Sequence, residues 1–153
     1  MNRTAPSYRE RLIGSWRFTS DDNRTGNADS PAIRYFGARP NGTFIFLENG
    51  RYAVILTHPE LPKFKANDRL KGTPEENMAV IRGVYAHFGT FAVDETKAEF
   101  VMRVEGSTFP NDIGTETVRK ITILTVDTLE FTNDSPPTGD AGTKAFVLLE
   151  RVD

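Results

Sequence analysis

Short runs of alternating or consecutive apolar residues recur along most of the chain and are separated by Gly, Pro, Asn and Asp. Alternation with a period of two is typical of a strand with one buried face, so these runs predict β-strands. The predicted strands cover 15–20, 43–47, 51–56, 89–93, 98–105, 117–126, 129–132 and 144–152. The second and third are joined by Glu48-Asn49-Gly50, and Asn-Gly is a strong hairpin signal because both residues tolerate a positive φ.

Two segments carry helix signals instead. A short helix is predicted over 8–13, where it ends at Gly14. A second is predicted from Pro74 to about His87, because Thr73 suits the N-cap, Pro suits the first position and two glutamates follow in the first turn. Its apolar positions fall on one face: Met78, Ile81, Val84 and Tyr85.

The remaining segments are polar and rich in turn formers, and we predict exposed loops over 21–31, 106–114 and 133–142. A chain with about eight antiparallel strands must close or cover its sheet edges. The pattern therefore predicts a mainly all-β fold, an eight-stranded antiparallel barrel with a short N-terminal helix and one inserted helix near 74–87. Barrels of this size can hold one small ligand.

Length and composition narrow the function classes. A chain of 153 residues is expected to form a single domain over 1–153. Its 19 basic and 21 acidic residues give a net charge of −2, which argues against general nucleic-acid binding. There is no cysteine, which excludes disulfides, thiol nucleophiles and cysteine-ligated metals. No apolar run is long enough to span a membrane and no signal peptide is evident, so a cytoplasmic protein is expected.

Motifs at both ends and in the middle of the chain carry a family resemblance. Gly14-Ser15-Trp16-Arg17 and the closing run 146–151 resemble the start and end of lipocalin and fatty-acid-binding (calycin) barrels. The stretches 41–54, 85–91 and 104–119 are similar to the bacterial and fungal lipocalin-like domain family, and the likeness covers about residues 11–152.

The resemblance implies a lipocalin-like β-barrel, small apolar ligands and an Arg151 side chain that packs over Trp16 at the barrel base. The chain departs from the family pattern at two places. Met102-Arg103 precedes Val-Glu-Gly-Ser where family members often have a histidine, and His87 stands where they commonly have tyrosine.

Three residues are candidates for catalysis: His87, Arg119 and Glu105. At a predicted helix C-terminus, the helix dipole would favour charged His87, which then either caps the helix or moves a proton at the barrel mouth. Arg119 ends an apolar strand face, where a guanidinium suits a ligand carboxylate, enolate or phenolate. The structural alternatives are a salt bridge to Glu105 or Glu116 and donation to loop carbonyls near Asn111. Glu105 belongs to the predicted outer face of its strand and would reach a ligand only if the strand faced the other way.

The expected ligand wall is mainly aromatic, with few polar contacts. Its predicted members are Tyr35, Phe44, Phe46, Tyr52, Phe91, Phe100, Met102, Asn111 and Arg119. Two histidines without cysteine or a ligand motif predict neither a metal site nor a cofactor.

The leading hypothesis is a barrel that binds a small apolar or aromatic molecule, with a polar contact from Arg119 or His87. The alternative is a cofactor-independent isomerase, cyclase, hydratase or lyase that uses the same cavity. A third reading is a partner-binding domain with a filled interior. The oligomeric state stays open, with a homodimer among the options.

Overall fold

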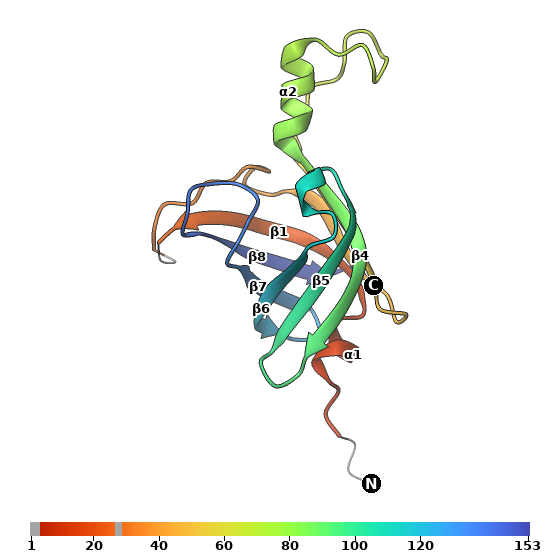
Figure 1. The fold of residues 1–153 in the computed structure, drawn as a ribbon, viewed down its shortest axis with the longest axis vertical. Helices are drawn as coiled ribbons and strands as arrows, with labels where there is room; N and C mark the ends of the chain where they lie inside the picture. The colour runs from red at the N-terminus through yellow and green to blue at the C-terminus, as the bar shows by residue number, and fades with distance from the viewer. Residues whose placement is uncertain (1–3, 27–28) are drawn as a thin grey trace.

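The structure is a computed structural model that describes residues 4–26 and 29–153. Over these residues, eight antiparallel strands each pair with the next, and the last pairs with the first to close a barrel (Figure 1). The strands are β1 (Gly14–Thr25), β2 (Asn41–Phe46), β3 (Arg51–Thr57), β4 (Val84–Asp94), β5 (Glu99–Ser107), β6 (Glu116–Leu124), β7 (Thr128–Asn133) and β8 (Thr143–Arg151). The predicted eight-stranded antiparallel barrel is confirmed.

The N-terminal helix α1 (Tyr8–Leu12) lies at one end of the barrel, and α2 (Pro74–Gly83) projects from the other (Figure 1). Both begin with a capping box, in which the N-cap hydroxyl and a glutamate three residues later satisfy the first backbone amides. A short 3-10 helix, η1 (Pro110–Asp112), follows β5. No helix among the described residues is long and apolar enough to cross a membrane.

The second helix is shorter than predicted. It ends at Gly83, and Val84 already has extended backbone angles that start β4. The apolar positions after Gly83 therefore belong to a strand, and His87 lies opposite Val54 of β3. The predicted apolar helix face is partly open, since the side chain of Ile81 is 73% exposed.

The predicted loop over 21–31 is wrong at its start, because β1 continues to Thr25. After an irregularity between Phe18 and Ser20, the strand pairs with β8 as far as Thr25 and Thr143. Asp21 and Asn23 point inward and are buried. Beyond this irregularity the alternation resumes one residue out of step and with polar residues inside, so the hydrophobic pattern that marks a strand is absent.

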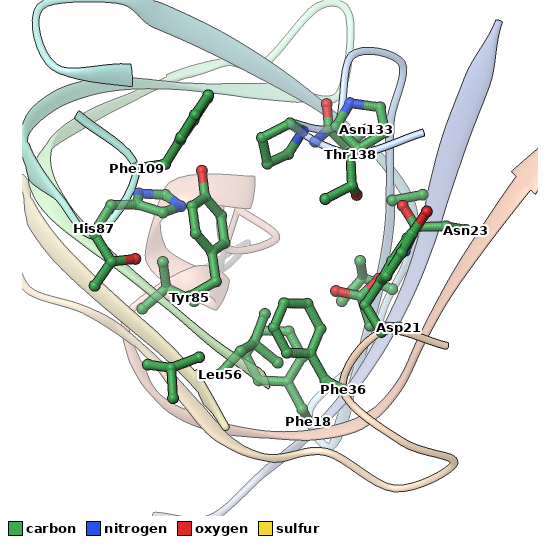
Figure 2. A pocket seen from close by; sticks show the side chains of 18 of the residues that line it. Phe18, Asp21, Asn23, Phe36, Leu56, Tyr85, His87, Phe109, Asn133 and Thr138 are labelled. Carbon is green, nitrogen blue, oxygen red and sulfur yellow. The ribbon is translucent and has the colours of Figure 1, made fainter. Parts of the chain in front are cut away.

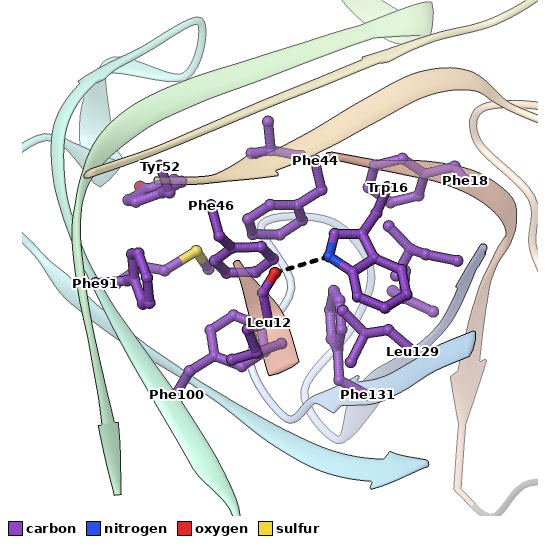
Figure 3. Close-up of a cluster of buried hydrophobic side chains, with 14 of the residues drawn as sticks. Leu12, Trp16, Phe18, Phe44, Phe46, Tyr52, Phe91, Phe100, Leu129 and Phe131 are labelled. Carbon is purple, nitrogen blue, oxygen red and sulfur yellow. Dashed lines mark hydrogen bonds between the residues drawn. The ribbon is translucent and has the colours of Figure 1, made fainter. Parts of the chain in front are cut away.

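The hydrophobic core fills the α1 end of the barrel with aromatic side chains (Figure 3). Trp16 is fully buried and its indole Nε1 donates a hydrogen bond to the Leu12 carbonyl at 2.9 Å. The Arg151 guanidinium lies 4.2 Å from the Trp16 ring and donates hydrogen bonds to the carbonyls of Arg11 and Ile13. The stacking of Arg151 on Trp16 expected at the barrel base is confirmed.

The facing of β5 is also as predicted. Phe100, Met102 and Val104 are buried inside, whereas Arg103 and Glu105 lie on the outer surface. The hairpin between β2 and β3 is confirmed as well, with Gly50 at a φ of 82°. The inward row of β5 thus continues from the core toward the opposite end of the barrel.

Candidate functional site

A cavity of about 670 Å³ occupies the α2 end of the barrel, beyond the aromatic core (Figure 2). Most of its wall is apolar. The inner apolar part is formed by Phe18, Phe36, Phe44, Val54, Leu56, Met102, Phe131, Ala145 and Val147. Side chains from α2, from the segment before η1 and from the 134–142 loop surround the mouth: Val80, Ile81, Phe109, Pro136 and Thr138.

Arg119 projects from β6 into this wall and is 7% exposed. Its Nη1 donates to the hydroxyl of Thr117 and to the Val118 carbonyl. Within the described residues, no carboxylate lies within 4.0 Å of the guanidinium. Burial lowers its pKa to about 10, partly offset by Tyr85, Tyr52 and nearby carboxylates, so the side chain remains a cation at neutral pH.

Asp21 and Asn23 form a second polar group on the β1 side of the cavity (Figure 2). The Asn23 amide nitrogen donates to Asp21 Oδ1 at 3.0 Å, while the buried Asn23 Oδ1 has no partner among the described residues. Burial raises the pKa of Asp21 to about 6, although the Asn23 hydrogen bond and the charge of Arg119 oppose it. A carboxylate is thus held in the cavity wall with little compensation.

His87 and Tyr85 face the cavity from β4, on the side away from Asp21 and Asn23 (Figure 2). The His87 Nδ1 lies 2.8 Å from the Tyr52 hydroxyl. Burial, assisted by the charge of Arg119, lowers the pKa of His87 to about 3, so the imidazole is neutral at physiological pH. The expectation of a charged histidine at a helix C-terminus is therefore wrong, because His87 lies in a buried strand.

Tyr85 closes the same side. Its hydroxyl donates to the carboxylate of Asp112 in η1, and burial raises its pKa above the usual value for a phenol. Burial raises the pKa of Tyr52 as well, so Tyr85 in the cavity wall and Tyr52 in the adjoining core both stay protonated.

The predicted site residues other than Glu105 divide into three groups. Those in the cavity wall are Tyr35, Phe44, Met102, His87 and Arg119. Those packed in the buried core beside it are Phe46, Tyr52, Phe91 and Phe100. Asn111 is exposed in η1, outside the wall.

Glu105 lies away from the cavity. Its carboxylate pairs with Arg51 on the outer surface at 2.5 Å, as expected for an outward-facing residue of β5. The alternative strand facing that would have brought Glu105 to a ligand does not occur, because Phe100, Met102 and Val104 take the inner face. Arg119 correspondingly makes no salt bridge to Glu105.

Sequence reasoning missed several polar residues of the wall, among them Asp21, Asn23, Tyr85 and Asn133. Simple alternation could not have found the first two, because the irregularity between Phe18 and Ser20 shifts the inward positions of β1 from Trp16 and Phe18 to Asp21 and Asn23. Within the described residues, no three His, Asp or Glu side chains come together as a metal site.

A closed eight-stranded barrel with an apolar cavity at one end defines the class of small ligand-holding barrels. The model of the lipocalin-like domain family matches residues 13–152, and the chain belongs to that family. Comparison with curated proteins gives no match.

Two of the solved structures that are similar to the chain have described ligands. One is a complex of bovine odorant binding protein with a selenium-containing odorant, at 15% identity and a TM-score of 0.45, covering 100% of this chain and 78% of that one. The other is a polyisoprenoid binding domain from Saccharophagus degradans implicated in plant cell wall breakdown, at 12% identity and a TM-score of 0.36, covering 91% and 94%.

Proposed function

We propose that the protein binds a small, largely apolar organic molecule in the barrel cavity. The observation that carries the proposal is a cavity of about 670 Å³ whose inner wall is almost entirely aromatic and aliphatic. Ligand pockets of about 300–1,000 Å³ with apolar walls and a few polar groups are typical of small-molecule sites. Arg119 and His87, the polar contacts expected from the sequence, both line it.

The cavity supports binding better than catalysis. The enzymatic alternative drew on His87, Arg119 and Glu105, and only the first two face the cavity. A histidine with a pKa of about 3 holds almost no proton at neutral pH and is a weak base. A filled barrel interior is supported still less, because the aromatic core occupies only the α1 end.

A bulky side chain at Ala145 is expected to block binding. Ala145 is a small buried residue of the cavity wall, paired in register with Asn23 on one side and Asn133 on the other. Ala145→Trp should weaken binding of the neutral fluorescent probe N-phenyl-1-naphthylamine at least about tenfold, because the indole would fill the cavity. Fluorescence titration measures the change.

Lys144→Trp is the matched control. Lys144 is the neighbour of Ala145 on β8, and it pairs outside the barrel with Asp134 at 3.3 Å. This variant should bind the probe as the wild type does. The proposal fails if the wild type does not bind the probe, or if both tryptophan variants bind it equally well while both remain folded.

A further inference from the structure

The Arg119 guanidinium has unused hydrogen-bonding capacity toward the cavity. Of its donor groups, only Nη1 bonds to described residues, and both partners, Thr117 and Val118, belong to its own strand. A buried cation without a contacting anion is costly. Arginine also has the planar fork that matches a carboxylate. The residue is therefore arranged as a receptor for an anion that the folded chain does not itself supply at contact distance.

Asn133 provides a second donor nearby. Its Oδ1 accepts a hydrogen bond from the Ser135 amide at 3.0 Å, which fixes the carboxamide and directs its NH₂ elsewhere. That NH₂ has no partner among the described residues. Continuing the Lys120–Thr132 register by one residue places Asn133 beside Arg119, and both line the cavity.

Asp21 is the buried carboxylate that shares the cavity with Arg119, and its charge acts on the guanidinium without a contact. Its register partner on β8 is Val147, which pairs with Phe131 of β7, so neither strand offers it a polar group. Asn23 alone donates a hydrogen bond to its carboxyl group within the described chain.

Two further ionisable side chains line the cavity, Tyr35 and Arg82, of which Arg82 is exposed on α2 at the mouth. The charged groups of the other bordering elements are already engaged, and His87 is neutral. Asp22 binds Arg24 and Arg34. Across the cavity, Asp112 accepts from Tyr85, and His87 hydrogen-bonds with Tyr52. Each of these groups lies on an element that lines the cavity or adjoins it: β1 with the 33–36 segment, β3, β4, and η1 directly after the cavity-lining Phe109.

We propose that the cavity binds an apolar molecule with one carboxylate head group, and that this head replaces Asp21 as the counter-charge of Arg119. The inference rests on the proposed function and names its ligand class. Asn133 donates to the same head group, and the apolar wall takes the rest of the molecule. Bringing a second negative charge into a buried site with one arginine favours protonation of Asp21, so binding takes up one proton from solvent.

The affinity for a carboxylate ligand should depend on pH through Asp21. Free Asp21 has a pKa of about 6, and a bound carboxylate raises it further because like charges disfavour ionisation. Affinity should therefore rise as pH falls from 8 to 6 and level off below the pKa of the free protein. His87 does not titrate in this range, since its pKa is about 3. The ligand carboxylate stays ionised, because such groups have pKa values of about 4–5.

The test is displacement of bound N-phenyl-1-naphthylamine by decanoic acid and by decan-1-ol, which share chain length and differ in the head group. The wild type should bind the acid at least about tenfold more tightly than the alcohol at pH 7, and more tightly at pH 6 than at pH 8. Equal binding of the two, with the probe bound, would overturn the ligand class and leave the proposed function standing. Failure to bind the probe, the acid or the alcohol would overturn the proposed function itself.

Two variants separate the roles of the charges. Asp21→Asn should bind decanoic acid more tightly than the wild type at pH 8 and with no dependence on pH. Arg119→Met should still bind the probe but lose the preference for the acid, whereas Arg103→Met, on the outer face of β5, should keep it. If Arg119→Met does not fold, the proposal is tested by Asp21→Asn alone. The exchange of counter-charges would be overturned if Asp21→Asn bound decanoic acid more weakly than the wild type, or if its binding still depended on pH.

Discussion

Replacement of Trp16 by alanine is expected to lower the free energy of unfolding by about 3–5 kcal/mol, the range for large aromatic residues in cores. The side chain is fully buried, and its Nε1 hydrogen bond to Leu12 ties α1 to the start of β1. It also supports Arg151, whose guanidinium stacks on the ring and donates to the carbonyls of Arg11 in α1 and Ile13 directly after it. Removal of the indole therefore opens a cavity and loosens the closure of the barrel base. Equilibrium unfolding in urea measures the loss.

Val126→Ala is the control for this measurement. Val126 lies in the neighbouring turn between β6 and β7, and its side chain is 77% exposed. Its truncation should change stability by no more than about 0.5 kcal/mol, as for ordinary surface positions. A loss below about 1 kcal/mol for Trp16→Ala would show that the indole does not hold the barrel base together.

The strands of the barrel were predictable because their signals are local and apolar, whereas the contact of Arg151 with Trp16 at the base was implied by the family resemblance. The β2–β3 hairpin has a turn with Gly50 at positive φ between two strongly apolar runs. The inward row of β5 follows from simple alternation, with Phe100 and Met102 inside and Arg103 outside. Each of these elements buries apolar side chains, so the hydrophobic pattern and the burial agree.

The cavity wall was less predictable because it breaks that agreement. Asp21 and Asn23 occupy inward positions of β1, where the hydrophobic pattern expects apolar residues, and the segment therefore resembles a loop. The pattern after Gly83 fits both a helix and a strand, and pairing with β3 decides for the strand. His87 was therefore predicted at a helix end but lies in a buried strand, and its pKa is lowered instead of raised.

These exceptions gather at one end of the barrel. The α1 end holds the fully buried aromatic residues and the Trp16–Arg151 closure. The α2 end holds the buried polar side chains Asp21, Asn23, His87, Arg119 and Asn133. Buried polar groups that are incompletely paired lower stability, and they persist where a site uses them. The division fits the proposed function, in which one end stabilises the fold and the other offers polar groups to a ligand.

The buried charge of Asp21 should lower the stability of the ligand-free protein at neutral pH, and Asp21→Asn should remove that cost. Asp21 has a pKa of about 6 in the folded protein against an ordinary value of 3.8, mainly because burial disfavours its charge. Between these values, the folded protein keeps a proton that the unfolded chain has lost, so this residue's contribution to stability falls as pH rises. The difference corresponds to about 3 kcal/mol above pH 7.

Asparagine resembles the protonated carboxyl group and retains an oxygen to accept the Asn23 hydrogen bond. The variant should therefore be more stable than the wild type by up to about 3 kcal/mol at pH 7.5, and the advantage should vanish near pH 4. Urea unfolding of both proteins across this range measures the difference, in which the other titrating groups cancel.

Asp22→Asn is the matched control because it should change the free energy of unfolding in the opposite direction. Although partial burial acts against ionisation, the hydrogen bonds and charges of Arg34 and Arg24 hold the pKa of Asp22 below 3.8. Removal of that carboxylate should lower stability at pH 7.5 and matter less as Asp22 becomes protonated in acid. If Asp21→Asn destabilised the protein at pH 7.5 as Asp22→Asn does, Asp21 would already be the satisfied counter-ion of Arg119. A ligand carboxylate would then find Arg119 already paired. This measurement on the ligand-free protein therefore tests the proposed exchange of Asp21 for the ligand head group.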